Sequence, residues 1–179
     1  MKNAIHEISK GKDFPKNVNI IVEIPKDSKI KFEIDKESGL IKIDRFLYSS
    51  VHYPGDYGFI PQTYWEDGDP LDMLVLTGIP VYPGVLASAR VIGVIHMNDN
   101  GESDDKILAV YEKDPRFSDV KSISDLPSHT LSELKHFFET YKELEGKRVQ
   151  VLEIKDKETA YEVLKKSVEI YRKKFGKKE

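Results

Sequence analysis

The sequence has no cysteine among its 179 residues. This absence excludes a disulfide framework, a thiolate zinc site and catalysis by a thiol. The chain also has no large excess of one charge sign, because 28 Lys and Arg stand against 31 Asp and Glu, for a net charge of −3. A mildly acidic chain without a basic arm argues against nucleic acid as its main partner. The composition predicts one cytoplasmic domain.

Long apolar runs are missing as well. Residues 73–89 carry no charge, but two glycines and two prolines interrupt them and they are too few for a spanning helix. We interpret this stretch as strand, turn and strand, and predict no membrane association. The first 14 residues mix charged and apolar side chains and do not resemble a secretory signal. A chain of this length can form one hydrophobic core without disulfides or a structural metal, so we predict a single domain over residues 1–179.

The apolar pattern predicts a mainly β protein. Period-two alternation and short apolar runs, separated by Gly, Pro, Asn and Asp clusters, are typical of strands joined by tight turns. The predicted strands cover 17–25, 29–35, 39–47, 72–79, 84–97, 106–113 and 147–155, and the predicted turns include 36–39, 53–58, 67–70 and 98–101. Sequential strands with short turns favour a closed antiparallel barrel or a sandwich.

Two helices are predicted in the last third of the chain, where the apolar residues recur at steps of three and four. The first opens with Thr130 and Glu133, at the spacing of a capping box, and stops at Gly146. The second opens in the same way with Thr159 and Glu162. The fold class is therefore mainly β, with packed α-helices near the C-terminal end.

The most informative segment is WEDGDPLDM, in which Asp67, Asp69 and Asp72 place three carboxylates within six residues. Such crowding is costly unless a cation neutralises it. In an extended segment Asp67 and Asp69 would face the same way. For DGDP alone, an ordinary acidic turn is the alternative interpretation. A calcium EF-hand fits poorly, because a loop counted from Asp67 would put Asp72 where glycine is needed.

A second acidic cluster lies between two strongly apolar strands and consists of Asp99, Glu102, Asp104 and Asp105. Dense oxygen ligands without His or Cys point to a hard cation, Mg²⁺ before Mn²⁺ or Ca²⁺. Basic residues accompany the acids along the chain, namely Lys31, Arg45 and Lys106. A site that combines carboxylates with cations suits a phosphate compound that arrives with Mg²⁺.

With DGDPLDM as its signature, the sequence resembles the soluble family I inorganic pyrophosphatases of the prokaryotic type. The similarity extends in order through VEIP, IKFEIDKESG, DRF, YPGDYGFIP, NDNGESDDK and HFFETYK. It implies a five-stranded, closed β-barrel of the OB type with two C-terminal helices packed outside. It also implies Mg²⁺-dependent hydrolysis of pyrophosphate to two phosphates by a metal-activated water, in a homohexamer.

The resemblance assigns roles residue by residue. Several Mg²⁺ ions per subunit are implied, with Mn²⁺ or Zn²⁺ as substitutes and Ca²⁺ as an inhibitor; their ligands are Asp67, Asp72, Asp104, Asp99 and Glu33. Asp69 matches the general base, and the phosphate-binding groups are Lys31, Arg45, Tyr57, Lys106, Tyr141 and Lys142. Of these, Tyr57, Arg45 and Lys106 join Asp69 as catalytic residues. Glu23 and Tyr53 match polar positions that line the site. Asn100 departs from relatives that have an acid there.

Two other functions stay open at this point. The same barrel could be a non-catalytic module that binds single-stranded nucleic acid, which would need exposed aromatic residues on a basic groove. A structural calcium-binding domain would be stabilised by Ca²⁺ without turnover. His96 and His136 have no ligand spacing, and we interpret both as structural or interface residues.

Overall fold

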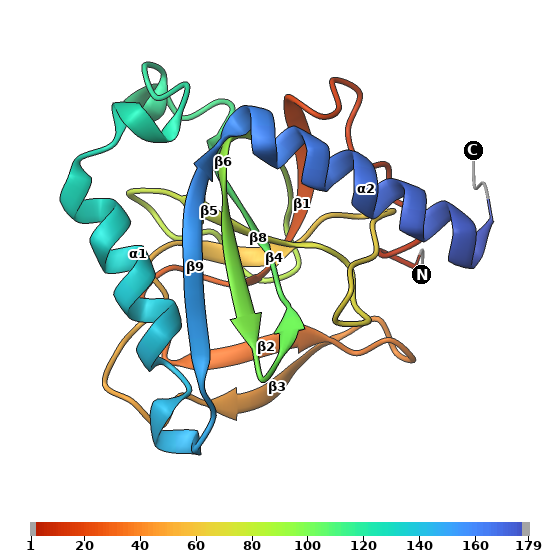
Figure 1. The fold of residues 1–179 in the computed structure, drawn as a ribbon. Helices are drawn as coiled ribbons and strands as arrows, with labels where there is room; N and C mark the ends of the chain where they lie inside the picture. Colours follow the sequence, from red (N-terminus) through yellow and green to blue (C-terminus); the bar gives the residue numbers. More distant parts are fainter. Residues whose placement is uncertain (1–2, 177–179) are drawn as a thin grey trace.

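A closed five-stranded barrel forms the centre of the computed structural model, which describes residues 3–176 (Figure 1). Its strands pair in the order β1 (Asn17–Ile24), β4 (Asp56–Phe59), β5 (Asp72–Leu76), β8 (Lys106–Tyr111) and β6 (Leu86–Asp99). The long β6 pairs back with β1 and closes the barrel. The strand β9 (Val149–Asp156) lies along β6 on the side of the helices. The predicted five-stranded barrel is confirmed.

The turn pattern suggested an antiparallel barrel, but one pair of barrel strands is parallel. β5 and β8 run parallel, with Asp72 opposite Lys106, whereas the other barrel pairs are antiparallel. The reason is topological: strand direction alternates around an antiparallel barrel, and five strands cannot alternate and also close. The parallel pair places the first residues of β5 and β8 at the same end of the barrel.

The strand β4 lies where the sequence predicted a turn. All four of its residues are buried, and Gly58 pairs with Val22 of β1. A Cβ atom at Gly58 would lie 1.9 Å from the carbonyl oxygen of Ile21, so only glycine permits this approach of the two strands. The turn-forming residues of this segment therefore serve close strand packing.

A separate two-stranded sheet lies below the barrel in Figure 1. It is the hairpin of β2 (Ile30–Ile34) and β3 (Ile41–Phe46), called the side hairpin below. Among the described residues it shares no strand pairing with the barrel. A tighter hairpin joins β6 to β7 (Glu102–Ser103) through Asn100 and Gly101, which both have positive φ, as expected of a type I′ turn.

Both predicted helices form, but their caps differ from the predictions. The helix α1 (Ser128–Thr140) begins two residues before Thr130, and its N-cap, Pro127, makes no side-chain hydrogen bond. The helix α2 (Lys157–Phe175) is capped by Asp156, whose side chain accepts a hydrogen bond from the Thr159 amide. The prediction of a polar N-cap is therefore confirmed only for α2, where the cap is Asp156 and not Thr159, three residues later. Short 3-10 helices are Pro115–Phe117, Ile123–Asp125 and Glu143–Glu145.

The helices cover the barrel with their apolar faces. From α1, Leu134, Phe137 and Phe138 join one buried cluster, and α2 contributes Ala160 and Leu164 to another. Figure 1 shows α1 flanking β9 and α2 crossing the end of the sheet. None of the helices in residues 3–176 is both long and apolar enough to span a bilayer.

Candidate active site

A cavity of about 460 Å³ opens between one end of the barrel and the side hairpin. This volume is within the range of small-molecule sites, about 300–1,000 Å³. Twelve charged side chains line it within the described chain: Glu23, Lys31, Glu33, Lys36, Asp67, Asp69, Asp72, Asp99, Glu102, Asp104, Lys106 and Lys142. Eight of the twelve are acids, so the cavity is negative overall.

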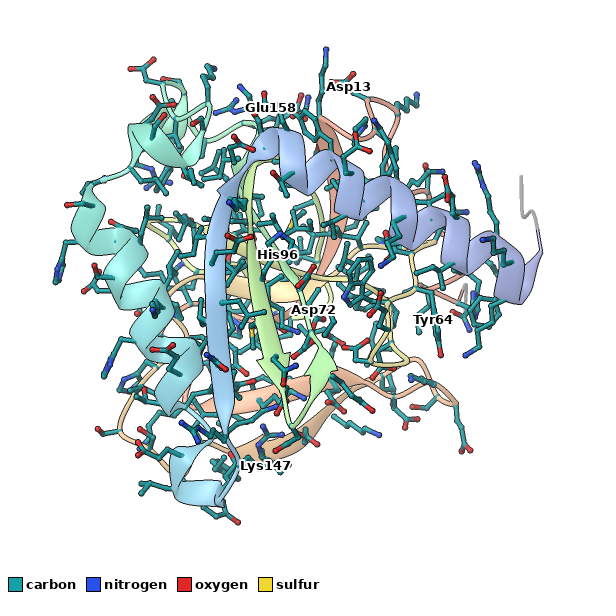
Figure 2. All side chains as sticks on the ribbon, in the orientation of Figure 1. Asp13, Tyr64, Asp72, His96, Lys147 and Glu158 are labelled. Atoms are coloured by element: carbon teal, nitrogen blue, oxygen red, sulfur yellow. The ribbon has the colours of Figure 1, made fainter. Side chains whose placement is uncertain are left out.

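Three of the predicted metal ligands meet in this cavity. Asp67, Asp72 and Asp104 each offer a carboxylate oxygen, and these oxygens lie within 4.8 Å of one another. Asp72 is the first residue of β5. Asp104 lies two positions before Lys106, the first residue of β8, so in extended backbone the two side chains point to the same side. The parallel pairing of β5 with β8 therefore brings together acids that are 32 positions apart. Figure 2 labels Asp72 near the centre of the view, above the side hairpin.

Lys106 and Tyr57 occupy the space between these carboxylates. The Lys106 ammonium group donates to Asp104 and, at 2.5 Å, to Asp72, and its side chain is only 3% exposed. The Tyr57 hydroxyl donates to the same oxygen of Asp72 at 2.6 Å. Tyr57 lies opposite Leu74, so its ring reaches the diagonal neighbour Asp72 across the β4–β5 pair.

Burial and mutual repulsion divide the protons unequally in the acidic trio. Burial, a hydrogen bond with Asp104 and the charge of Asp72 raise the pKa of Asp67 to about 7. Burial opposes ionisation of Asp104 too, but the charge of Lys106 outweighs it and lowers that pKa. Burial likewise disfavours the Lys106 cation, yet Asp72 and Asp104 raise its pKa, so it stays charged. The metal-free cluster thus tolerates its own charge by holding one proton and one lysine.

Asp69 lines the cavity but lies outside the trio. Its Oδ1 is 2.5 Å from Nζ of Lys36 in the side hairpin, and both side chains are exposed. The turn predicted at 67–70 is present, because the Trp65 amide donates to the Asp69 carbonyl, and Asp67 and Asp69 therefore do not share a face as they would in an extended segment. The turn directs Asp67 inward and Asp69 to the rim.

The side hairpin supplies one wall of the cavity. Lys31 and Glu33 lie on it as a pair, with Nζ and Oε1 at 2.5 Å. Glu23 of β1 accepts a hydrogen bond from the Ile34 amide at 2.7 Å and thereby connects the hairpin to the barrel. Burial raises the pKa of Glu23 to about 8, although the Ile34 amide opposes this shift.

The opposite wall is formed by the end of β6 and the end of α1. Lys142 donates to Asp99, and Asn100 also donates to Asp99 through its amide group. Tyr141 stacks on Phe137, with ring centroids 5.1 Å apart, and lines the cavity as well. It therefore belongs to the core and to the site, whereas its helical spacing alone indicated only the core.

Most of the predicted site residues are brought together, with one exception. Tyr53 is buried and lines the cavity, but Arg45 does not line it. Among the acids of the second cluster, Asp105 faces the other way and pairs with His96 at 2.9 Å, as expected for a structural histidine. Lys36 lines the cavity without having been predicted, because a lysine in a turn carries no signal of what it reaches.

Known proteins resemble this chain along almost its whole length. A sequence model described as "Inorganic pyrophosphatase" matches residues 20–172. The chain is 48% identical over 166 residues to soluble inorganic pyrophosphatase 1 of Arabidopsis thaliana, which covers 93% of this chain and 78% of the relative. It is also 48% identical over 170 residues to soluble inorganic pyrophosphatase 2 of Chlamydomonas reinhardtii, covering 95% and 88%. Because these relatives are plant and algal proteins, the restriction to a prokaryotic type stays a prediction.

Solved structures give the same result. The inorganic pyrophosphatase from Thermus thermophilus superposes with a TM-score of 0.92 at 40% identity, over 96% of this chain and 99% of that one. The inorganic pyrophosphatase from Helicobacter pylori has a TM-score of 0.88 at 43% identity, over 93% and 99%. Sequence and fold agree over nearly the whole chain, and the chain belongs to the inorganic pyrophosphatase family, the hydrolases of diphosphate.

Proposed function

We propose that this protein hydrolyses inorganic pyrophosphate to two orthophosphates in a Mg²⁺-dependent reaction, by direct attack of water and without a covalent intermediate. One observation carries the proposal: the oxygens of Asp67, Asp72 and Asp104 lie within 4.8 Å of one another in a cavity that also contains lysines. The acids suit the metal and the lysines suit the phosphates. Neither group alone would serve a phosphate ligand that arrives with metal ions.

The trio fits a hard divalent cation. Its donors are all carboxylate oxygens, without sulfur or imidazole, which favours Mg²⁺ or Mn²⁺ over softer metals. Because the pKa of Asp67 is raised to about 7, the metal-free cluster holds a proton there below that pH, which a divalent ion would replace. We assign Asp67, Asp72 and Asp104 to the metals nearest the reacting water, and Asp99 and Glu33 to metals on the substrate. When bound, such ions supply charge neutralisation and activation of water.

Basic and hydroxyl groups around the trio would bind the phosphates. Lys31, Lys106 and Lys142 come from three walls of one cavity, so together they surround an anion at its centre. The Tyr57 and Tyr141 hydroxyl groups would donate to phosphate oxygens, since burial raises the pKa of both and keeps their protons in place. Phosphoryl transfer depends mainly on such positioning and charge neutralisation.

Asp69 is proposed as the general base. It lies at the rim, where water has access, and Lys36 holds its carboxylate there. An exposed carboxylate can accept a proton from the attacking water and pass it to solvent. Tyr53 is buried and Glu23 is partly buried where the hairpin meets the barrel, and both would support the wall that carries Lys31.

We also propose that the chain assembles as a homohexamer in the cytoplasm. The resemblance suggests this assembly, and exposed apolar side chains on one loop, Ile79, Tyr82 and Val85, offer surface for a contact. Light scattering of the purified protein measures the mass directly. A monomer at micromolar concentration would contradict this part of the proposal.

Phosphate release from pyrophosphate tests the proposed function, with Mg²⁺, with EDTA, and with ATP as a competing substrate. We expect turnover with Mg²⁺ only. Asp104→Asn should abolish it, whereas its neighbour Asp105→Asn should retain it, because Asp105 faces His96 outside the cavity; the exposed Asp119→Asn is a second control. Stabilisation by Ca²⁺ without any turnover would favour a structural calcium site instead. Metal-independent binding of single strands that weakens with salt would favour the nucleic-acid module.

A further inference from the structure

Arg45 is held by two carboxylates that have no place in the proposed metal or phosphate sites. Its Nε donates to Glu145 at 2.9 Å and its Nη1 donates to Asp44 at 2.6 Å. Lys31, Lys106 and Lys142, in contrast, each pair with an acid assigned to a metal, although Nζ of Lys31 also lies 3.6 Å from Oδ2 of Asp44. A metal that binds those acids would free Lys106 and Lys142 but would leave Arg45 with Glu145 and Asp44. The arginine is therefore held in a different way from these three cations.

Glu145 is unusual for an acid on a short turn. Only 8% of its side chain is exposed, although its neighbour Glu143 is exposed and makes no ion pair within the described chain. A carboxylate is seldom buried unless it is paired. Burial alone would lower the pKa of Arg45, yet Glu145 and Asp44 raise it and keep the guanidinium charged. The Arg45–Glu145 contact is thus a partly buried ion pair, which removal of one partner would disrupt.

The pair joins two walls of the cavity. Arg45 lies on β3 of the side hairpin, which has no strand pairing with the barrel among the described residues. Glu145 ends the turn that directly follows Tyr141 and Lys142, both of which line the cavity. In Figure 1 this turn, drawn in light blue, lies beside the side hairpin, and Figure 2 marks the adjacent Lys147 there. The contact therefore fixes the hairpin against the turn that carries two proposed phosphate-binding groups.

One nitrogen of the guanidinium, Nη2, is not used by either carboxylate. Nη2 of Arg45 is buried and has no hydrogen-bond partner among the described residues. A guanidinium carries five N–H donors in a fixed plane, so carboxylates on Nε and Nη1 also fix the direction of Nη2. Arg45 does not line the cavity of the metal-free protein, so a phosphate oxygen would reach Nη2 only through a local shift; it would then satisfy a buried cationic donor without displacing Glu145 or Asp44.

We propose that Glu145 is a positioning residue for substrate binding: it orients the Arg45 guanidinium so that Nη2 is left for a phosphate oxygen. The proposal rests on the proposed function, because Arg45 is expected there to bind the phosphates. The alternative is that Glu145 competes with the phosphate for Arg45, in which case removal of Glu145 would tighten phosphate binding. The sign of the change in phosphate affinity distinguishes the two roles.

Inorganic phosphate is the probe, with binding to the full-length protein measured by calorimetry in the presence of Mg²⁺. Glu145→Gln should weaken phosphate about tenfold, the effect of losing one hydrogen bond to a charged group. The KM for pyrophosphate should rise to a similar extent with a smaller change in kcat, while Mg²⁺ affinity without phosphate stays the same. Glu143→Gln, in the same turn, should change none of these values, and Glu145→Asp should restore part of the phosphate affinity.

A double-mutant cycle with Arg45→Ala decides whether Glu145 acts through the arginine. We expect Glu145→Gln to have no further effect on phosphate affinity once Arg45 is absent. Additive losses, unchanged affinity or tighter binding in Glu145→Gln would overturn the proposal. If Arg45→Ala itself leaves phosphate affinity unchanged, or the wild-type protein releases no phosphate from pyrophosphate, the assignment under the proposed function fails; in the second case the cycle still decides whether Glu145 orients Arg45 toward an anion.

Discussion

Nζ of Lys31 lies 2.5 Å from Oε1 of Glu33, so a side chain proposed for phosphate is paired with one proposed for a metal. The same arrangement recurs elsewhere in the cavity, in the pairs Lys106–Asp72, Lys106–Asp104 and Lys142–Asp99. Each lysine neutralises a carboxylate of the metal-free protein and is unavailable to an anion. A divalent ion that takes the carboxylate leaves the lysine free for phosphate, so the two ligands should assist each other.

The first prediction is reciprocal coupling between Mg²⁺ and phosphate. We expect saturating Mg²⁺ to tighten inorganic phosphate by about 5- to 150-fold, and saturating phosphate to tighten Mg²⁺ by the same factor, because linkage is symmetric. Calorimetric titration of each ligand with and without the other measures both factors. Equal phosphate affinity with and without Mg²⁺ would show that the lysine–acid pairs do not couple the sites.

The second prediction separates the two members of one pair. Lys31→Ala should weaken phosphate about tenfold or more, since a charge-assisted contact is lost. The same change removes the partner of Glu33, so Mg²⁺ affinity should stay the same or increase. Lys29→Ala is the matched control, because Lys29 is an exposed lysine just before the same strand and does not line this cavity. Equal losses of phosphate and Mg²⁺ affinity would contradict the role of Lys31.

The acidic site could be predicted from local sequence, but its geometry could not. Crowding of Asp67, Asp69 and Asp72 indicates a cation, because three adjacent carboxylates repel one another unless something neutralises them. The arrival of Asp104 depends on the parallel pairing of β5 with β8, and no local pattern records which distant strands become neighbours. The strand β4 escapes prediction because its glycine serves a close strand contact, which has the same local composition as a turn.

Ion pairs between distant segments are likewise invisible in the pattern. Lys36 reaches Asp69 across 33 positions, and Arg45 reaches Glu145 across 100. In sequence Lys36 and Glu145 are ordinary charged residues near turns. The pattern marks Asp69 as one of three crowded acids and Arg45 as a base that accompanies the acids, but only the resemblance to a family assigns each a specific role, and it assigns none to their partners. Residues that hold functional side chains in place are therefore found from the fold.

The third prediction follows from the proton held by Asp67. Burial, the hydrogen bond with Asp104 and the charge of Asp72 raise its folded-state pKa to about 7, above the value of about 3.9 expected in the unfolded chain. The folded metal-free protein binds this proton more tightly, so its free energy of unfolding should fall as the pH rises from about 4 to about 7. Asp67→Asn should reduce this fall, raise the melting temperature near pH 8 and weaken Mg²⁺ binding strongly. Thermal melts of both proteins across this pH range measure the difference.

Mg²⁺ must displace the same proton when it binds. Its affinity should therefore rise between about pH 6 and about pH 8, and binding near pH 6.5 should release close to one proton. Calorimetry in two buffers of different ionisation enthalpy counts the protons. Fluorescence of the single tryptophan, Trp65, gives an independent signal, because its amide donates to Asp69 within the acidic turn. A Mg²⁺ affinity that does not change with pH in this range would show that Mg²⁺ displaces no proton from Asp67.

The last prediction concerns Asp69, which lines the cavity but stands apart from the acidic trio. If it is the general base, Asp69→Asn should lower kcat by about 100-fold, within the usual contribution of a positioned base, with only a modest loss of Mg²⁺ affinity. The acid side of the pH–rate profile should also change, because an amide cannot accept the proton. Glu66→Gln removes a charge from the same turn but pairs with Lys166 outside the cavity, so it should leave kcat and the profile intact. If Asp69→Asn instead loses Mg²⁺ affinity as strongly as Asp67→Asn does, Asp69 is a metal ligand, and the proton of the attacking water must go to another group.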